Sequence, residues 1–390
     1  MRRLGVLIAI VVHIHSAAAQ NIPVKGSTAT FDLATWNIEH FGNDGAEPHD
    51  DERQLENVRQ VIVQSQIDLW AVQEIEDDED FERFVSALGG GWRGELDRAS
   101  TNLKIGFIYN SDVIHLRRKR NILTTYTSKF AGRPPLVIEV DVAAGDRSHI
   151  LTIVTLHMKC CTDSWERREG ASKALKDYLD FLLPSASVIV LGDWNDELTT
   201  SITSGRSTPY RNFLDDSEDY SFVTLDLEQA GRNTFCFSSS CSSGSTIDHI
   251  LITNELFAAF DTTDTFDELI TALSPYVSST SDHLPVFARF SLPTDTAIED
   301  MPEAVLSIQS IHPNPLSSSA VLEFSTGRAG HVLVEIYDLL GRRTAVLSYG
   351  FLPAGPHVEQ VNTNGLAAGP YVLVVRTQDA RLVRPISVIR

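Results

Sequence analysis

The sequence predicts an α/β protein with sheets flanked by helices, followed by a small all-β sandwich domain. Three observations lead to this expectation. Strand-like runs alternate with amphipathic helices between residues 21 and 291. Residues 292–302 form a polar linker that contains prolines. From residue 301 onward there is no lysine and no helical period, and short apolar runs are separated by glycine and proline turns.

Periodicity locates the elements of both predicted domains. Apolar residues at helical spacing predict helices over Asp51–Gln66 and Trp165–Leu183, and Pro184 ends the second. In the first domain we expect strands over Phe31–Asn37, Ile67–Ile75, Leu103–Tyr109, Leu136–Val142, His149–His157, Ser187–Leu191 and Thr246–Thr253. In the second we expect them over Val321–Phe324, Val332–Tyr337 and Tyr371–Arg376.

The N-terminus has the features of a signal peptide. Met1-Arg2-Arg3 is a short basic start, the run from Leu4 to Ile14 is mostly apolar, and Ala17-Ala18-Ala19 offers a cleavage site. We therefore expect residues 1–19 to be removed, the α/β domain over 20–291, the linker over 292–302 and the β-sandwich over 303–390. No later apolar run is long enough to span a bilayer, so the mature chain is predicted to have no transmembrane segment.

Charge and cysteine content narrow the class further. The chain has 390 residues and a net charge of −20, which does not fit a non-specific coat protein for nucleic acid. An enzyme that meets phosphates through a bound cation remains compatible with it. Four cysteines in an exported protein favour disulfides. Cys236 and Cys241 are close enough to close a loop, and Cys160 and Cys161 are adjacent, but the sequence leaves all three connectivities open.

Polar residues suited to metal binding recur at the ends of the apolar strands of the first domain, where Asp248 opens a strand and Asp282 and His283 lie in a turn motif. They are Asn37, Glu74, His157, Asp193, Asn195, Asp248, Asp282 and His283. Strand ends are where open α/β folds place their sites. Carboxylates and amides are hard oxygen ligands, so the set predicts Mg²⁺, with Mn²⁺ or Ca²⁺ as alternatives, rather than zinc.

Each of these residues also has an ordinary structural explanation. An asparagine after a strand is commonly a turn residue, and Asp-x-Asn after glycine is often an Asx turn or a helix cap. The acidic run from Glu76 to Asp80 reads as a solvated helix start. The joint pattern favours the functional interpretation.

That joint pattern resembles the endonuclease/exonuclease/phosphatase superfamily, which includes deoxyribonucleases, abasic-site endonucleases, sphingomyelinases and inositol polyphosphate 5-phosphatases. The resemblance runs from about Phe31 to Phe290. It rests on six motifs in the family's order: Trp36-Asn37, Gln73-Glu74, the strand ending at His157, Gly192-Asp193-Trp194-Asn195, Ile247-Asp248-His249-Ile250 and Ser281-Asp282-His283-Leu284-Pro285. The resemblance implies a four-layered α/β sandwich, with two packed sheets flanked by helices.

The resemblance also implies roles for these residues. Asn37, Glu74 and, through water, Asp282 match ligands of a divalent cation. Asp193 and Asn195 match residues that orient and deprotonate the attacking water, and Asp248 pairs with His283. His157 matches a histidine that contacts the phosphate. Either Asp193 or His283 remains open as the base.

Three basic features are weaker signals. Arg133 matches an arginine near the scissile phosphate in the deoxyribonuclease branch, and a loop arginine held by prolines explains it equally well. Lys159 could add charge beside His157. The run Arg117-Arg118-Lys119-Arg120 could follow a nucleic-acid backbone, or could be the charged edge of a sheet.

The C-terminal region, from about Leu306, resembles the sorting domain of type IX secretion cargo. The matching pieces are His312-Pro313-Asn314-Pro315, the segment Ile336–Arg342, the segment Leu366–Tyr371 and the basic ending at Arg390. This implies the type IX secretion machinery as a partner and export through the outer membrane, to the medium or the cell surface. A generic adhesion or carbohydrate-binding sandwich is the alternative, but no tryptophan follows residue 301.

Together these observations predict a secreted, monomeric, divalent-metal-dependent phosphodiesterase. We expect a nuclease that hydrolyses DNA or RNA by in-line attack of an activated water. The first alternative is a phosphatase or phospholipase acting on lipid or inositol phosphates. The second is a non-catalytic surface protein on the same scaffold, which would be expected to lack at least one of the site residues.

Overall fold

The computed structural model describes residues 21–389 apart from 101, 295–305, 328–329 and 378–379. The predicted signal peptide and most of the predicted linker lie outside the described residues. Two large mixed sheets and their helices precede residue 295, and antiparallel sheets follow residue 305.

The first large sheet has six strands, and its centre is parallel. Its order is β13 (Phe260–Thr265), β14 (Val286–Phe290), β1 (Phe31–Phe41), β2 (Leu69–Ile75), β4 (Lys104–Asn110) and β3 (Trp92–Leu96). Only β1 and β2 are parallel neighbours; the other pairs are antiparallel.

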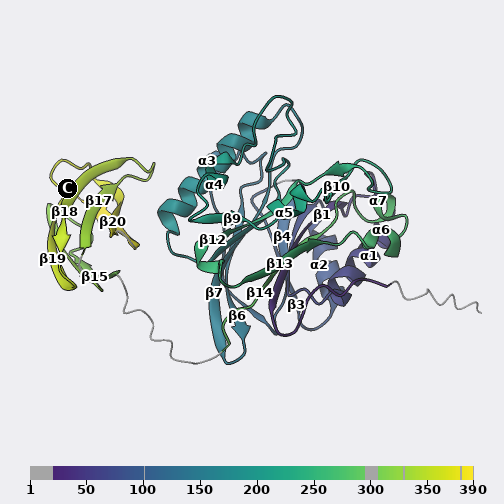
Figure 1. The fold of residues 1–390 in the computed structure, drawn as a ribbon, viewed down its shortest axis with the longest axis horizontal. Coiled ribbons are helices and arrows are strands. Elements are labelled where there is room, and N and C mark those ends of the chain that lie inside the picture. Colours follow the sequence, from purple (N-terminus) through teal and green to yellow (C-terminus); the bar gives the residue numbers. More distant parts are fainter. Residues whose placement is uncertain (1–20, 101, 295–305, 328–329, 378–379, 390) are drawn as a thin grey trace, which may run out of the picture.

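The second large sheet repeats this plan. Its order is β5 (Ile114–Asn121), β6 (Leu136–Ala144), β7 (Arg147–His157), β8 (Val188–Asp193), β12 (Asp248–Thr253) and β9 (Tyr220–Phe222). Here β7 and β8 are the parallel pair. A two-stranded ribbon of β10 (Phe235–Cys236) and β11 (Gly244–Ser245) comes between β9 and β12 in the sequence and lies next to the large sheets (Figure 1).

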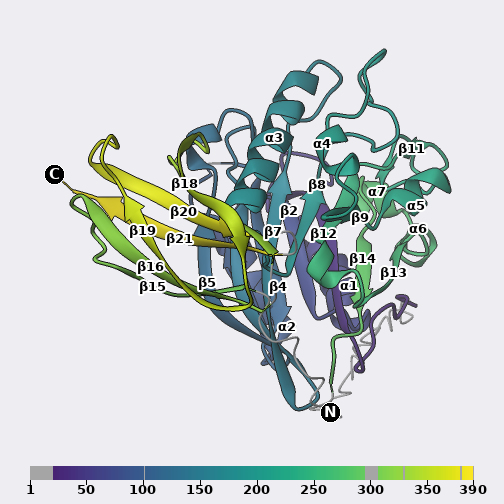
Figure 2. The ribbon, with the colours of Figure 1, turned by 60° about the vertical axis from the view of Figure 1, so that its left-hand side comes forward.

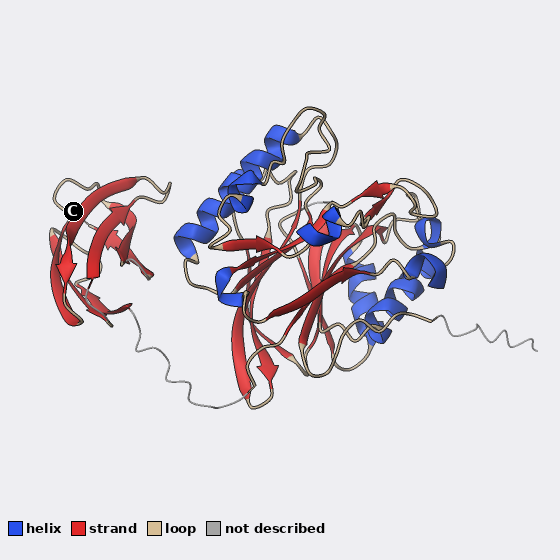
Figure 3. Cartoon of the chain, in the orientation of Figure 1, coloured by secondary structure: helices blue, strands red, loops and turns tan. Residues whose placement is uncertain are grey.

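Helices cover the two outer faces, and the sheets pack against each other between them (Figure 1; Figure 3). On the first sheet lie α1 (Asp51–Gln64), α2 (Asp78–Leu88), α6 (Leu269–Ala272) and α7 (Tyr276–Ser279). On the second lie α3 (Trp165–Leu182) and α4 (Arg211–Leu214). The remaining short helices are α5 (Leu225–Gln229) and the 3₁₀ turns Thr124–Tyr126 and Asn254–Leu256. The predicted four-layered α/β sandwich is confirmed.

Three apolar cores hold the layers together. Alternation along β1 directs Leu33 between the two sheets and Trp36 under the helices, so the strand is buried on both faces. The third core lies between the second sheet and α3, around Leu156 and Trp194. The acidic run near Asp77 starts α2 as predicted, since its carboxylate accepts from the amide of Asp80.

The C-terminal region consists of two antiparallel sheets (Figure 2). One contains β15 (Leu306–His312), β16 (Ser319–Thr326) and β19 (Gly355–Asn362). The other contains β18 (Arg343–Leu352), β17 (Gly330–Tyr337), β20 (Gly369–Arg376) and β21 (Arg381–Val388). Inward-facing residues such as Leu322, Ile336 and Leu373 form one core, in agreement with the predicted all-β sandwich.

Candidate functional site

The two large sheets bring their polar strand ends to one common edge. Asn37 and Gln73 form the last regular pair between the parallel strands of the first sheet, and Glu74 follows Gln73. In the second sheet His157 is in register with Asp193, and Asp193 with Asp248. A hydrogen bond of 3.1 Å from Asn37 Nδ2 to Asp193 Oδ2 joins the two sheets at this edge.

Glu74 reaches the site because β2 is irregular at this residue. The pairing with β4 shifts register between Gln73 and Ile75, and Glu74 has a φ of +65°. A bulge of this kind re-aims a side chain out of the normal alternation, at a conformational cost. The Glu74 carboxylate accepts from Asn37 Nδ2 at 3.0 Å.

Asp193 is held by a tight approach of β8 to β7. Gly192 has a φ of +156°, and a Cβ there would lie 2.1 Å from the carbonyl oxygen of Leu156. Only glycine fits this position. The next side chain, Trp194, is fully buried against Tyr210 and Phe222 and donates to the carbonyl of His249 at 3.0 Å. The turn that carries Asp193 is therefore anchored in the third core, between the second sheet and α3.

Asn195 completes this turn. Its φ is +56°, and its amide donates to Asp193 Oδ1 at 2.9 Å. Its side-chain amide donates to the carbonyl of Met158 at 3.3 Å, just beyond His157. The neighbouring His249 has a structural role: burial lowers its pKa to about 3, and it contacts Thr224 and the carbonyl of Asp196.

His283 and Asp248 form a buried pair. His283 Nδ1 lies 2.8 Å from Asp248 Oδ2, and its Nε2 lies 4.0 Å from Asp193 Oδ2. Burial acts to lower the pKa of His283, but the charges of Asp248 and its neighbours outweigh burial and raise that pKa well above the ordinary value. The carbonyl of His283 accepts from Tyr276 and Trp36, which fixes the backbone.

The site carries an excess of negative charge. Burial raises the pKa of Asp193 to about 7, and Asp248 and Glu74 add to the effect by repulsion. Burial and the charge of Asp282 raise the pKa of Glu39 to about 8. Sequence reasoning missed Glu39, which accepts from the amide of Asp282 at 2.9 Å. Its position two residues after Asn37 on the same strand was the available signal.

His157 differs from His283. Burial, followed by the charge of Arg133, lowers its pKa well below the ordinary value, so its imidazole is neutral. Its Nε2 lies 3.4 Å from Asp193 and 3.7 Å from Glu74. Its buried Nδ1 has no hydrogen-bond partner among the described residues.

The donor set fits a hard divalent cation. Ligand atoms of Glu74, His157 and Asp193 lie within 4.8 Å of one another, and the amide of Asn37 touches both carboxylates. Burial, with repulsion from Asp248 and Glu74 added to it, raises the pKa of Asp193, and a bound cation would offset both by stabilising the carboxylate. Asp282 lies at the same edge, with its carboxylate 3.9 Å from His283.

The predicted basic residues lie around the site rather than within it. Arg133 is buried and donates to the carbonyls of His157 and Met158 at 3.2–3.4 Å. Lys159 Nζ lies 3.1 Å from the sulfur of Cys160. The run from Arg117 to Arg120 lies on the edge strand β5, where three of its four residues are in ion pairs, so the structure favours the sheet-edge interpretation.

A cavity of about 540 Å³ opens over the site. One of its walls is aromatic and was not predicted. Phe235 packs on the ring of His283 at 5.0 Å, and Phe237 meets Phe235 edge-on at 5.3 Å while remaining 65% exposed. Other residues around the cavity include Glu74, His157, Cys160, Cys161, Asp193, Asn195, Ile202, Ile247, Asp282 and His283.

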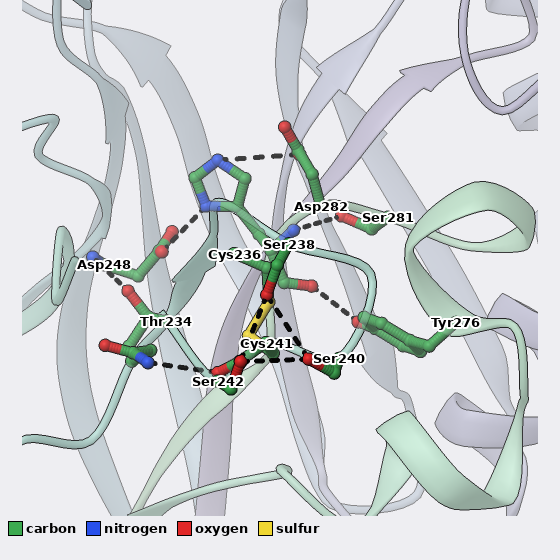
Figure 4. The surroundings of a disulfide bond; sticks show 12 residues. Thr234, Cys236, Ser238, Ser240, Cys241, Ser242, Asp248, Tyr276, Ser281 and Asp282 are labelled. Atoms are coloured by element: carbon green, nitrogen blue, oxygen red, sulfur yellow. Dashed lines mark hydrogen bonds and ion pairs between the residues drawn. A yellow bond between two sulfur atoms is a disulfide. The ribbon is translucent and has the colours of Figure 1, made fainter. Parts of the chain in front are cut away.

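A disulfide closes the loop that carries this wall. Cys236 and Cys241 are bonded, with their Cα atoms 4.6 Å apart. This bond excludes the two crossed pairings among the three connectivities that the sequence left open. Figure 4 shows the disulfide below Asp282 and Asp248. The amide of Cys236 donates to the carbonyl of Asp282 at 2.8 Å, so the loop is joined directly to the segment that carries Asp282 and His283.

Comparisons with known proteins agree with this geometry. The sequence model of the Endonuclease/Exonuclease/phosphatase family matches residues 34–283. That of the Secretion system C-terminal sorting domain matches residues 310–388. A comparison with curated proteins finds no match. No helix in the described part of the chain is long and apolar enough to cross a membrane.

Solved structures share the fold at low identity. TDP2 of D. rerio, complexed with a single strand DNA product, is 13% identical with a TM-score of 0.52; the match covers 68% of this chain and 100% of that chain. The endonuclease/exonuclease/phosphatase from Bacteroides vulgatus is 15% identical with a TM-score of 0.50; the match covers 68% of this chain and 99% of that chain.

Proposed function

Since the chain belongs to the endonuclease/exonuclease/phosphatase family, we propose that it is a divalent-metal-dependent phosphodiesterase that hydrolyses nucleic acid. Family membership gives the coarser part of this statement, a phosphoester hydrolase. The sorting domain indicates export by type IX secretion, to the cell surface or beyond. The metal dependence and the nucleic-acid substrate are the parts proposed here.

One observation carries the proposal: Asp193 lies between two histidines, and burial favours the neutral form of one while neighbouring carboxylates favour the cationic form of the other. Its Oδ2 is 3.4 Å from the neutral His157 and 4.0 Å from His283, whose partner Asp248 favours the cationic form. A phosphodiester placed over this edge would meet an acceptor, a neutral donor and a cation together. In-line displacement at phosphorus requires these three elements.

We assign roles to the chain's own residues on this basis. Asp193, oriented by Asn195, accepts the proton of the attacking water. His157 donates a hydrogen bond to a phosphoryl oxygen, and His283 offsets the negative charge that builds up there. Arg133 supplies positive charge from behind His157, whose carbonyl it holds.

Glu74 and Asn37 would hold the cation, with Asp282 contacting it through water. A bound Mg²⁺, or Mn²⁺ or Ca²⁺, would polarise the phosphoryl oxygen and reduce the repulsion between a polyanion and an acidic protein. The excess of carboxylates described above supports this assignment, since without a cation they would repel the substrate.

The aromatic wall supports nucleic acid over a sugar phosphate. Phe237 exposes most of its ring beside the cavity, and such rings stack on nucleobases whatever the sequence. The same exposed ring could enter a lipid surface, so a phospholipid is the second candidate. We also propose that the protein is a monomer.

The test is hydrolysis by the protein lacking residues 1–19. Supercoiled plasmid, single-stranded RNA and phospholipid vesicles are each incubated with Mg²⁺, Mn²⁺, Ca²⁺ or a chelator. We expect metal-dependent cleavage of a nucleic acid that is lost in Glu74→Ala and kept in Glu79→Gln, a change at an exposed position of α2 away from the cavity. Headgroup release without nucleic-acid cleavage would move the assignment to phospholipids, and no hydrolysis of any of them would refute the proposed activity.

A further inference from the structure

The two cysteines outside the disulfide lie together at the rim of the cavity. Cys160 and Cys161 follow the end of β7, and both border the space over the site. Their sulfur atoms are 2.6 Å apart. Non-bonded heavy atoms make their best contact at about 3.5–4.0 Å, so these sulfurs are closer than two separate thiols prefer.

The backbone and its neighbours hold this pair in place. Cys161 has a φ of +80°, which is unusual for a residue with a side chain. Arg168, fully buried on α3, donates Nη1 to the carbonyls of Lys159 and Cys161 at 2.9 and 2.8 Å. The Lys159 ammonium also donates to the sulfur of Cys160.

Arg168 connects this segment to the turn that carries Asp193. Its guanidinium forms a fully buried ion pair with Asp196 at 2.8 Å. Asp196 in turn accepts from Ser201 Oγ and the amide of Ile202, which also borders the cavity. A change in the backbone at Cys161 can therefore be transmitted to the cavity wall and to the Asp193 turn through the contacts of Arg168 and Asp196.

We propose that Cys160 and Cys161 form a reversible vicinal disulfide in the exported protein, and that this bond sets the rim of the substrate cavity. The bond itself is independent of the proposed function, whereas its effect on catalysis rests on it. Cys236 and Cys241 already pair with each other, so the other two of the four cysteines can pair within the chain only with one another.

The reaction is a thiol–disulfide exchange with an extracytoplasmic disulfide, of an oxidoreductase or a small thiol. The thiolate of one cysteine attacks the oxidant's disulfide, which forms a mixed disulfide and releases one thiolate. The second cysteine then attacks the bonded sulfur of the first and releases the other. Two electrons pass to the oxidant, and the two protons lost by the cysteines are taken up by the released thiolates.

The covalent geometry makes this bond easier to reduce than an ordinary one. Neighbouring Cα atoms across a trans peptide are about 3.8 Å apart, whereas disulfides usually join Cα atoms about 4.4–6.8 Å apart. Strained disulfides are the more readily reduced class. Reduction would let the sulfurs separate and loosen the two carbonyls that Arg168 holds.

The bond is tested by mapping thiols in the full mature chain isolated under non-reducing conditions. The protein is alkylated without reductant, digested and analysed by mass spectrometry. We expect the peptide containing Cys160 and Cys161 to resist alkylation and to be about 2 Da lighter than its dithiol form. Alkylation of both residues before reduction would overturn the proposal, whatever the activity of the protein.

The effect on the cavity is tested with Cys160→Ser/Cys161→Ser. Reductant should raise the KM of the wild type by about 2- to 30-fold, the range of coupling between packed elements. The double variant should show the raised KM from the start and should not respond to reductant. An equal response in both proteins would trace the effect to Cys236–Cys241, and no response in either would remove the cavity role; both results contradict the proposal.

Discussion

His283 and Asp248, 35 positions apart in the chain, are joined by a hydrogen bond of 2.8 Å. Asp248 opens β12 of the second sheet, while His283 precedes β14 of the first. Because Asp248 binds Nδ1, the other ring nitrogen, Nε2, is directed to Asp193 and Asn37. The pair therefore depends on correct packing of the two sheets.

We predict that Asp248→Asn lowers kcat by about 10²–10³-fold, as loss of one preorganised charge-stabilising contact does. The carboxamide is neutral and cannot favour the imidazolium as a carboxylate does. The measurement is kcat together with the melting temperature. Asp146→Asn, in the exposed turn between β6 and β7, is the control and should be unchanged. Activity of Asp248→Asn within threefold of wild type, in a folded protein, would refute the role of the pair.

We predict that Glu74→Gln weakens binding of Mn²⁺ by at least about tenfold, because the neutral amide removes a charged ligand. The variant keeps an oxygen that can accept from Asn37, so the fold should be retained. Titration calorimetry measures the binding without any turnover. Glu79→Gln is the control, since Glu79 is exposed in the first turn of α2 and does not border the cavity. Equal affinities in both variants would exclude Glu74 as a ligand.

Much of the fold could be predicted because the spacing of apolar residues along the sequence matches the faces that its helices and strands bury. The helix expected over Asp51–Gln66 is α1, and that over Trp165–Leu183 is α3. The seven strands expected in the first domain correspond to β1, β2, β4, β6, β7, β8 and β12. The structure also brings the predicted site residues to one edge, because the ends of neighbouring buried strands meet at the same edge of a sheet.

The rest of the site depends on features without a local signal. The φ of +65° at Glu74 arises from a mismatch between β2 and β4, which neither strand shows alone. Arg168 reads as a surface residue of an amphipathic helix, yet it is fully buried because Asp196 meets it from a distant turn. The aromatic wall of Phe235 and Phe237 becomes visible only when its loop is folded beside His283.

We predict that Phe237→Ala raises the KM for a single-stranded oligonucleotide by about 5- to 150-fold, because stacking of one base on an aromatic ring contributes about 1–3 kcal/mol. The side chain is 65% exposed and supports no core, so stability should be unchanged. The measurement is steady-state kinetics on an oligonucleotide with one cleavage site.

The control for this prediction lies in both protein and substrate. Phe257→Ala removes a partly exposed phenylalanine away from the cavity and should leave KM unchanged. A substrate with an abasic residue beside the scissile phosphate should bind wild type and Phe237→Ala equally. If Phe237→Ala weakens both substrates to the same extent, the ring does not act by stacking on a base.

Asp68 provides a prediction about stability that is independent of the site. It lies just before β2, and its carboxylate accepts from the amide of Asp32 at 2.9 Å. Asp32 is itself fully buried and paired with Arg289 at 2.8 Å. Burial raises the pKa of Asp68 to about 7, and the charge of Asp32 adds to the shift, while the hydrogen bond opposes it.

We therefore predict that Asp68→Asn stabilises the protein above pH 7. In the unfolded chain this carboxyl loses its proton near pH 4, whereas in the folded chain it keeps the proton to about pH 7. Between these values the folded state binds more protons, so the contribution of Asp68 to stability is present at low pH and is lost as the pH rises. Asparagine keeps the acceptor oxygen and carries no charge at any pH.

Urea unfolding from pH 4 to pH 8 should show a stability difference between variant and wild type that grows with pH, on the order of 1 kcal/mol per pKa unit. Asp226→Asn, at an exposed position, is the control and should give a constant difference. A difference of constant size for Asp68→Asn as well would mean that its carboxyl is ionised in the folded protein over the whole range.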